Sequence, residues 1–388
     1  MRIWIVGGGT GGHIYPALAV AEALRAVDPA LEVIWVGTPD GMEARLIPPL
    51  GFPFLPVEAG GVVGMGLRRG VWGVMRLARG VRQARRAIRR MRPQALFTTG
   101  GYAAIPPALA AALHRVPILV YLPDLEPGWA VRLLARLAAQ VAVTVPEAQA
   151  AFGGRPVLVT GYPVRRGLLA GARRRAEARR QGLARWGFRE EEPVLLVFGG
   201  SRGARRLNQA VARHLEDLTA WAQVLHLTGP LDGEAAQAWR ARLPPERQAR
   251  YRPVAYLHDE MGEAMAMADL AVCRAGASTL GELPVFGLPA VLVPYPYVRR
   301  HQERNADYLV RQGAAVMIPD AEVEERLGEA VQGLLGDPGR LAEMRRRMAA
   351  LARPEAADRL AATVLALAGG SPGRDPVPQP ASTGGRGR

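Results

Sequence analysis

The sequence predicts an α/β protein of two Rossmann-like domains whose parallel sheets face each other across a cleft. Short apolar runs alternate with helical patterns along the chain, which is typical of parallel sheets covered by helices on both faces. One glycine-rich loop begins at Gly7 and a second begins at Gly199, roughly half the chain later, and each follows an apolar run. A chain of 388 residues is long enough for two such domains.

Composition narrows the class of protein. Apolar residues make up 49% of the chain, which is enough for a core in each domain. The single cysteine, Cys273, excludes a disulfide framework and a cysteine metal site, and it fits a reducing cytoplasm. The net charge is +15 and all 50 basic residues are arginine, which favours anionic partners. The N-terminal apolar stretch is too short for a signal peptide, and no apolar run is long enough to span a bilayer.

The first domain, predicted over residues 1–163, opens with a strand at Ile3–Val6, a glycine loop and a helix at Ala17–Ala26. A loop without side chains lets backbone N–H groups approach a phosphate, and a helix N-terminus adds a favourable partial charge. The loop lacks the acidic residue of a dinucleotide site and the Gly-Lys-Ser/Thr of a P-loop. A tight turn with nothing bound is the alternative interpretation. Further strands are predicted at Glu32–Val36, Phe54–Val57, Ala95–Phe97, Ile118–Tyr121, Val141–Val143 and Val157–Val159.

The segment 67–92 combines an apolar helical stripe with ten arginines, and no acidic residue occurs from Ala59 to Pro123. One interpretation is a domain helix whose stripe packs on the sheet while its arginines are solvated. The other is a basic amphipathic surface that docks on anionic lipid, with Trp72, Met75 and the arginines facing the membrane. The two are compatible. Nucleic acid is not an expected partner, because the arginines lack aromatic interleaving and a known binding motif. The predicted stripe consists of Leu67, Val71, Val74, Ala78, Val81, Ala84, Ile88 and Met91.

The second domain is predicted over residues 164–350, with helices at 172–186 and Leu207–Leu218. A closing helix over 351–368 and a disordered tail over 369–388, rich in Gly, Pro, Ser and Arg, follow it. Its strands are predicted at Val194–Phe198, Val224–Leu227, Leu270–Cys273, Ala290–Val293 and Ala315–Ile318.

A small-residue loop, Arg274–Thr279, follows one of these strands, and Glu282 lies one turn into the next helix. Such a loop can hold a diphosphate, and the carboxylate of Glu282 can accept hydrogen bonds from vicinal sugar hydroxyls. Gln302 and Asn305 share a face of a later helix and can bind further hydroxyls. The alternative is that Glu282 is an ordinary first-turn acid favoured by the helix dipole.

A series of ordered motifs over residues 1–365 resembles the MurG family, the bacterial N-acetylglucosaminyltransferases that complete the lipid-linked cell-wall precursor. The motifs are Gly8-Gly9-Thr10-Gly11-Gly12-His13 with Pro16, Gly100-Gly101-Tyr102, Gly161-x-Pro163-Val164-Arg165, Gly199-Gly200-Ser201-x-Gly203-Ala204 with Asn208, Cys273-Arg274-x-Gly276-Ala277-x-Thr279-x-x-Glu282, and His301-Gln302-x-x-Asn305-Ala306.

The resemblance implies a GT-B fold and an inverting transfer of N-acetylglucosamine, without metal or cofactor. The donor is UDP-N-acetylglucosamine, and the acceptor is undecaprenyl-pyrophosphoryl-N-acetylmuramoyl-pentapeptide at the cytoplasmic face of the membrane, where the enzyme is peripheral. His13 is then the general base, because a sugar hydroxyl needs a proton acceptor within hydrogen-bond reach. Gly8, Gly9, Gly100, Gly101 and Tyr102 bind the acceptor. The implied donor-binding residues are Thr10, Gly11, Gly12, Asp124, Arg165, Ser201, His258, Ala277, Ser278, Thr279, Leu280, Gly281, Glu282 and Gln302.

One segment departs from the family pattern. Where the family usually has His-Glu-Gln-Asn, this chain has Tyr121-Leu122-Pro123-Asp124, so only Asp124 imitates the last position, with an added negative charge. The departure leaves two alternatives open. One is a related GT-B transferase with another lipid acceptor or another sugar, and the other is a non-catalytic membrane scaffold that binds nucleotide.

Overall fold

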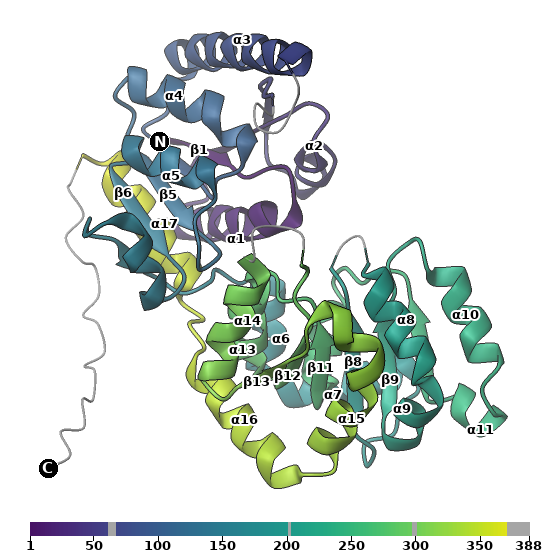
Figure 1. Cartoon of the computed structure of the whole chain (residues 1–388). Helices are drawn as coiled ribbons and strands as arrows, with labels where there is room; N and C mark the ends of the chain where they lie inside the picture. The colour runs from purple at the N-terminus through teal and green to yellow at the C-terminus, as the bar shows by residue number, and fades with distance from the viewer. Residues whose placement is uncertain (61–66, 201–202, 297–300, 371–388) are drawn as a thin grey trace, which may run out of the picture.

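The computed structural model describes residues 1–60, 67–200, 203–296 and 301–370, with the backbone alone for residues 67–72. Figure 1 shows two lobes, each with a sheet between helices. Every strand pair in both sheets is parallel, as the sequence predicts. The first sheet has the order β3-β2-β1-β4-β5-β6-β7, and the second has the order β10-β9-β8-β11-β12-β13.

The predicted strands all form, with ends shifted by a residue or two. The first sheet contains β1 (Arg2–Val6), β2 (Glu32–Gly37), β3 (Phe54–Pro56), β4 (Ala95–Thr98), β5 (Ile118–Leu122), β6 (Gln140–Val143) and β7 (Leu158–Val159). The second contains β8 (Val194–Phe198), β9 (Gln223–Leu227), β10 (Tyr251–Val254), β11 (Leu270–Cys273), β12 (Ala290–Leu292) and β13 (Ala315–Met317). The sequence did not predict β10, because Pro253 interrupts it; an edge strand tolerates a proline, and β10 is at the edge.

The helices cover both faces of each sheet. The first lobe has α1 (Gly11–Val27), α2 (Met42–Leu46), α3 (Leu67–Met91), α4 (Ile105–Leu113) and α5 (Trp129–Leu137). The second has α6 (Arg166–Arg173), α7 (Arg175–Trp186), α8 (Arg205–Arg213), α9 (Leu215–Trp221), α10 (Gly233–Ala241), α11 (Pro245–Gln248), α12 (Met261–Met267), α13 (Glu282–Phe286), α14 (His301–Arg311), α15 (Val323–Leu335) and α16 (Pro338–Ala350). Short 3-10 turns include η2 (Tyr102–Ala104) and η4 (Ala277–Leu280).

The chain crosses between the lobes twice. It leaves the first sheet after β7 and enters α6, and after α16 it returns as α17 (Ala356–Ala368) (Figure 1). Leu360 and Val364 of α17 are fully buried in the same core cluster as Ile3 and Leu24 of the first lobe. The last described helix therefore belongs to the core of the first lobe. The predicted disorder of the tail concerns residues that lie almost wholly outside the described ones.

Two predicted helices are in fact pairs of helices. The helix expected over 172–186 is divided at Arg174 into α6 and α7, and the one expected over Leu207–Leu218 is divided at His214 into α8 and α9. The ring of His214 donates from Nε2 to the carbonyl of Glu324 at 2.9 Å and packs against Gly328 of α15. This tertiary contact, which local periodicity does not reveal, accompanies the break.

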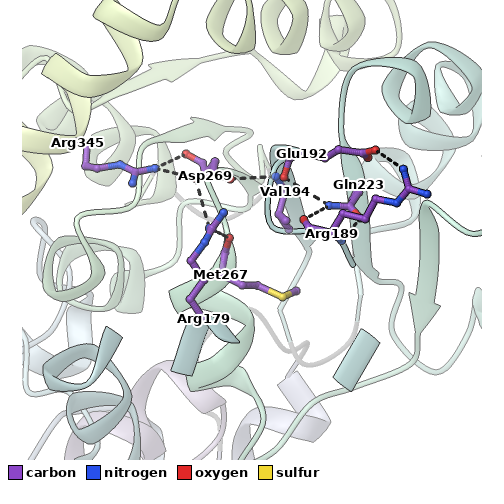
Figure 2. A network of polar contacts seen from close by, with 8 residues as sticks. All are labelled: Arg179, Arg189, Glu192, Val194, Gln223, Met267, Asp269 and Arg345. Atoms are coloured by element: carbon purple, nitrogen blue, oxygen red, sulfur yellow. Dashed lines mark hydrogen bonds and ion pairs between the residues drawn. The ribbon is translucent and has the colours of Figure 1, made fainter. Parts of the chain in front are cut away.

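An ion-pair network anchors the strands of the second sheet at their amino ends (Figure 2). Asp269, directly before β11, accepts a hydrogen bond from the Val194 N–H of β8 at 3.0 Å. Its carboxylate also pairs with Arg179 of α7 and with Arg345 of α16, at 3.5 and 3.2 Å. The network lies at the amino ends of the strands. The carboxyl ends of the strands, on the opposite side, carry the loops of the candidate site.

The helix α3 confirms the predicted amphipathic segment, but only part of the predicted stripe faces the core. Ala84 and Ile88 of that stripe are buried, as predicted, whereas Val74 and Ala78 are exposed and Gly73 and Gly80, outside the stripe, are buried. A Cβ atom at Gly80 would lie 1.8 Å from the carbonyl oxygen of Glu58, so glycine is required for the close approach. Apolar periodicity therefore predicted Ala84 and Ile88 of the packing face correctly and missed the two glycines. No helix among the described residues has the length and apolarity needed to cross a bilayer.

Candidate active site

The two strand orders place the glycine loops at equivalent positions. In each sheet the strand order reverses between two neighbours, β1 and β4 in the first sheet and β8 and β11 in the second. Ligands of such sheets bind outside the carboxyl ends of the strands at this reversal. The loops after β1 and β4 hold Gly8, Gly9, Gly100 and Gly101, and the loop after β11 leads into η4. The sequence-predicted loops therefore lie where the topology favours a site.

The first glycine loop is built around a buried carboxylate that sequence reasoning missed. Glu43 of α2 is fully buried and accepts hydrogen bonds from the N–H of Gly9 at 3.1 Å and from the N–H and hydroxyl of Thr38 at 3.0 and 2.8 Å. A Cβ at Gly8 would lie 2.5 Å from the same carboxylate. Gly8 is thus required for close approach, and Gly9, with φ of +89°, for its backbone conformation.

His13 lies in the first turn of α1, which begins at Gly11, earlier than the helix predicted from Ala17. Its ring Nδ1 is 2.9 Å from the carbonyl oxygen of Thr99, and the Thr99 hydroxyl donates to the His13 carbonyl at 2.8 Å. A carbonyl can only accept, so in the neutral ring Nδ1 carries the proton and Nε2 keeps its lone pair. The site therefore holds a histidine in the tautomer that a general base needs.

The second glycine loop completes the surroundings of this histidine. Gly100 and Gly101 have φ of +97° and +82°, and Cβ atoms there would lie 3.7 and 3.5 Å from the His13 ring. Burial lowers the pKa of His13 from its usual 6.5, while Asp124 and the hydrogen bond to Thr99 oppose that shift and His301 adds to it. His301 belongs to α14 of the second lobe, so His13 faces the opposing lobe across the cleft.

Aromatic side chains close one side of the cleft. The hydroxyls of Tyr15 on α1 and Tyr256 after β10 are 2.8 Å apart, and the Arg165 guanidinium lies 4.5 Å from the centre of the Tyr15 ring. The ring of His258 contacts Tyr256 edge to face at 4.8 Å. The backbone N–H of His258 is already bound by the carboxylate of Glu260 at 3.1 Å. Side-chain contacts thus connect α1, which carries His13, to the loop that carries His258 in the other lobe.

Glu282 is the first residue of α13, directly after η4, and only 9% of it is exposed. Burial raises the pKa of Glu282, while Arg165 and a hydrogen bond from Ser278 oppose that rise. The Tyr162 ring packs where a Cβ of Gly281 would lie, and its buried hydroxyl has no hydrogen-bond partner among the described residues. Arg165, Ser278 and Glu282 therefore form one polar group beside the crossing between the lobes.

The structure brings together most of the predicted site residues. Gly100 and Gly101 lie against the His13 ring, Gly9 lies against Tyr102, and Asp124 interacts with His13 from the loop after β5. Arg165 and Ser278 interact with Glu282 on the side of the second lobe. Gln302 uses its side-chain oxygen to accept the N–H of Tyr295 at 2.9 Å. Ser201 lies outside the described residues. Among the described residues, no three His, Cys, Asp or Glu side chains gather as metal ligands.

The prediction that Asn305 binds sugar hydroxyls is wrong for the arrangement seen here. Its amide donates to Asp124 at 2.9 Å and to the carbonyl of Ala275 at 3.1 Å, and it accepts the N–H of Leu125 at 3.2 Å. The amide is fully buried. Asn305 therefore joins the lobes, a role that spacing on one helix face did not reveal.

A second buried network lies behind the loop after β8. Asn208 of α8 donates to the Thr228 carbonyl at 2.8 Å and to Asp232 at 2.7 Å, and accepts from His226 Nε2 at 3.0 Å. Burial lowers the pKa of His226 to about 3. Asn208 thus holds the loop after β9, and the histidine that orients it carried no recognisable sequence signal.

Comparisons with known proteins match both lobes. The N-terminal domain model of glycosyltransferase family 28 matches residues 3–143, and the C-terminal domain model matches residues 194–360. A protein of Roseiflexus sp. (strain RS-1) is 42% identical, with 93% of this chain and 94% of the relative covered. One of Desulforudis audaxviator is 40% identical, covering 95% and 99%. Both are named UDP-N-acetylglucosamine--N-acetylmuramyl-(pentapeptide) pyrophosphoryl-undecaprenol N-acetylglucosamine transferase.

Solved structures agree. The crystal structure of Acinetobacter baumannii MurG has a TM-score of 0.76 at 28% identity, covering 94% of this chain and 99% of that one. A UDP-GlcNAc 2-epimerase of Neisseria meningitidis, at 13% identity and a TM-score of 0.66, covers 94% of this chain and all of its own, and shares the fold alone. Two facing Rossmann-like domains with these matches define a glycosyltransferase of the GT-B fold. Within glycosyltransferase family 28, the chain belongs to the MurG family.

Proposed function

We propose that this enzyme transfers N-acetylglucosamine from UDP-N-acetylglucosamine to undecaprenyl-pyrophosphoryl-N-acetylmuramoyl-pentapeptide, with inversion at the anomeric carbon. The names of the relatives at 42% and 40% identity, which span nearly their whole length, support both substrates. The single observation that carries the mechanism is His13, held with Nε2 unprotonated and facing the opposing lobe. A half-buried, neutral imidazole is suited to take a proton from a sugar hydroxyl.

The residues have separate parts in the proposed reaction. The acceptor hydroxyl attacks the anomeric carbon of the donor sugar as its proton passes to His13 Nε2, and the bond from that carbon to the UDP oxygen breaks. Arg165 and the backbone N–H groups of the small-residue loop stabilise the negative charge that develops on UDP. The buried carboxylate of Glu282 accepts hydrogen bonds from the ribose hydroxyls. The acceptor pyrophosphate binds beside the glycine loops that follow β1 and β4, next to His13.

Radiolabel transfer from UDP-N-acetylglucosamine to a short-chain analogue of the lipid acceptor tests this proposal. We expect a product that is labelled on the muramoyl sugar. A screen of other lipid acceptors should accompany this assay, because residues 121–124 depart from the family pattern. Transfer to another lipid acceptor but not to the muramoyl analogue would contradict the proposed substrate, and UDP binding without any transfer would contradict the proposed enzyme.

We further propose that α3 docks the enzyme on the anionic cytoplasmic face of the membrane. Figure 1 shows α3 at the outer side of the first lobe, away from the second. Val74 and Met75 are 53% and 49% exposed on it. The exposed arginines Arg79, Arg82, Arg86, Arg89 and Arg90 form no ion pair with other described residues. Apolar side chains among unpaired cations are the features of a surface that binds anionic lipid.

Vesicle binding tests the docking proposal. Arg76 is left unchanged in this test, because its guanidinium approaches the carboxylates of Asp40 and Glu58 at 3.6 and 3.8 Å. Replacing Arg79, Arg82 and Arg86 with glutamine should weaken binding to vesicles containing phosphatidylglycerol and spare activity on a soluble acceptor. The same change at the exposed Arg174, Arg180 and Arg213 of the second lobe is the charge-matched control. Equal losses in both variants would contradict a docking surface on α3.

A further inference from the structure

One amide joins the two lobes directly beside the candidate base. Asp124 follows β5 of the first lobe, and Asn305 lies on α14 of the second. A backbone N–H can only donate and a carbonyl can only accept, so the contacts of Asn305 with Leu125 N–H and the Ala275 carbonyl fix the orientation of its amide. The remaining N–H of that amide points to the Asp124 carboxylate, 2.9 Å away. This orientation leaves Asp124 as the acceptor in a half-buried contact between the lobes.

The same carboxylate acts on His13. The titratable groups that influence His13 are Asp124 from the loop after β5 and His301 from α14, and its ring is held by the Thr99 carbonyl after β4. Asp124 favours the charged imidazolium, whereas burial and His301 disfavour it. A general base becomes a cation when it takes the proton, so a nearby carboxylate stabilises the state formed during transfer.

We propose that Asp124 is a positioning residue: by holding Asn305 of the opposing lobe, it fixes the sugar-binding lobe against the lobe that carries His13, with its charge beside the base. The proposal rests on the proposed transfer reaction. This role differs from the donor-binding role that the family resemblance implied for Asp124. Oδ1 of the Asp124 carboxylate accepts a hydrogen bond from Asn305 of the protein itself.

Two substitutions separate the two parts of this role. Asp124→Asn keeps an oxygen that can accept from Asn305 and removes the charge, and it also restores the residue type of the family pattern. Asp124→Ala removes both. Glu126→Gln is the matched control, because it removes the same charge from the same loop, where Glu126 pairs with Arg304 of α14 at 3.3 Å in a solvated position. Such a surface pair contributes little.

The first measurement is the titration of the His13 ring by NMR in the protein without substrates, with its signal assigned by its loss in His13→Gln. Asp124→Asn should lower the pKa of His13 by about one unit, and Glu126→Gln should leave it unchanged. The acidic limb of kcat/KM should move to lower pH by the same amount in Asp124→Asn and should stay in place in Glu126→Gln. An unchanged titration in Asp124→Asn would overturn the electrostatic part of the proposal.

The second measurement addresses the contact between the lobes. Asp124→Ala should speed hydrogen exchange of the Leu125 amide, which Asn305 protects, and should reduce kcat/KM about tenfold or more at every pH. Asp124→Asn should keep the protection. Equal exchange and equal kcat/KM in Asp124→Ala and Asp124→Asn would overturn the positioning role. If the unmodified enzyme transfers no sugar, the proposed function fails, while titration and exchange still decide the role of Asp124.

Discussion

At the scale of single residues, His13 shows how a backbone contact decides chemistry. Its neighbours Gly100 and Gly101 carry no side chain, so the ring fits against them and Nδ1 reaches the Thr99 carbonyl. That contact fixes the tautomer, and burial keeps the ring neutral by lowering the pKa of His13 below 6.5. Both effects suit the proposed role of general base, because a base must be unprotonated and must direct its lone pair to the substrate.

The first prediction concerns this residue. His13→Ala should reduce kcat a hundredfold or more, which is the usual range for the loss of a general base. Because the pKa of His13 is lowered from 6.5, the ring stays neutral at pH 7, and kcat/KM of the unmodified enzyme should fall only below pH 6.5. The variant should lose this acidic limb. Steady-state kinetics from pH 5 to 8 measure both effects.

His114 provides a matched control. It caps the C-terminal end of α4, shortly before β5 begins, and therefore lies at the amino ends of the strands, away from His13. His114→Ala should leave kcat and the acidic limb unchanged. A full rate in His13→Ala, or an acidic limb that persists in it, would remove His13 from the role of base.

The sequence predicted individual site residues better than their partners. His13, Glu282 and the glycines follow strands in a pattern that local periodicity and the family motifs both expose. Glu43 and Asn305 could not be assigned in the same way, since their roles depend on groups that are distant in sequence: Glu43 binds Gly9 across α1 and β2, and Asn305 binds Asp124 of the other lobe. Long-range partners of this kind have no period and no local spacing.

At the scale of elements, α3 shows that a packing face can be made of glycine. Gly73 and Gly80 face the segment 58–60 and α4, so the helix approaches them closely while larger apolar residues, Val74 and Met75, turn outward. A prediction from hydropathy alone places Met75, Ala84 and Ile88 correctly but turns Val74 inward, because glycine contributes no apolar signal. The outward side chains of Val74 and Met75 are part of the proposed docking surface.

Gly80→Ala tests the packing of α3. A Cβ there would lie 1.8 Å from the Glu58 carbonyl oxygen, so the helix must shift, and we expect a loss of about 1–3 kcal/mol in the free energy of unfolding. Gly333→Ala in α15 is the control, because a Cβ at Gly333 meets no atom within 4 Å. Alanine favours a helix over glycine, so this variant should gain up to about 1 kcal/mol. Urea denaturation measures both, and a Gly80→Ala protein as stable as the unmodified one would contradict the assigned packing.

At the scale of the whole molecule, the sequence predicted two facing domains but not how they meet. Alternating strands and helices, with a glycine loop in each half, were sufficient for the two parallel sheets. The contacts between the lobes come from side chains that are far apart in the chain. Tyr15 of the first lobe contacts Tyr256 of the second, and Asp124 of the first contacts Asn305 of the second. Because His13 belongs to one lobe and Glu282 to the other, these contacts bear on whether the proposed base and the proposed donor site meet.

The pair of tyrosine hydroxyls gives the last prediction. Tyr15→Phe and Tyr256→Phe each remove one partner of the 2.8 Å hydrogen bond and keep both rings, including the contact of Arg165 with Tyr15. A hydrogen bond of this kind contributes about 1 kcal/mol, so each variant should reduce kcat/KM about fivefold through a lower population of the closed arrangement. The double variant should lose no more than either single one, because all three lack the same bond. Losses that multiply to about twenty-fivefold in the double variant would show that the two hydroxyls act independently, and the contact would then play no part in holding the lobes together.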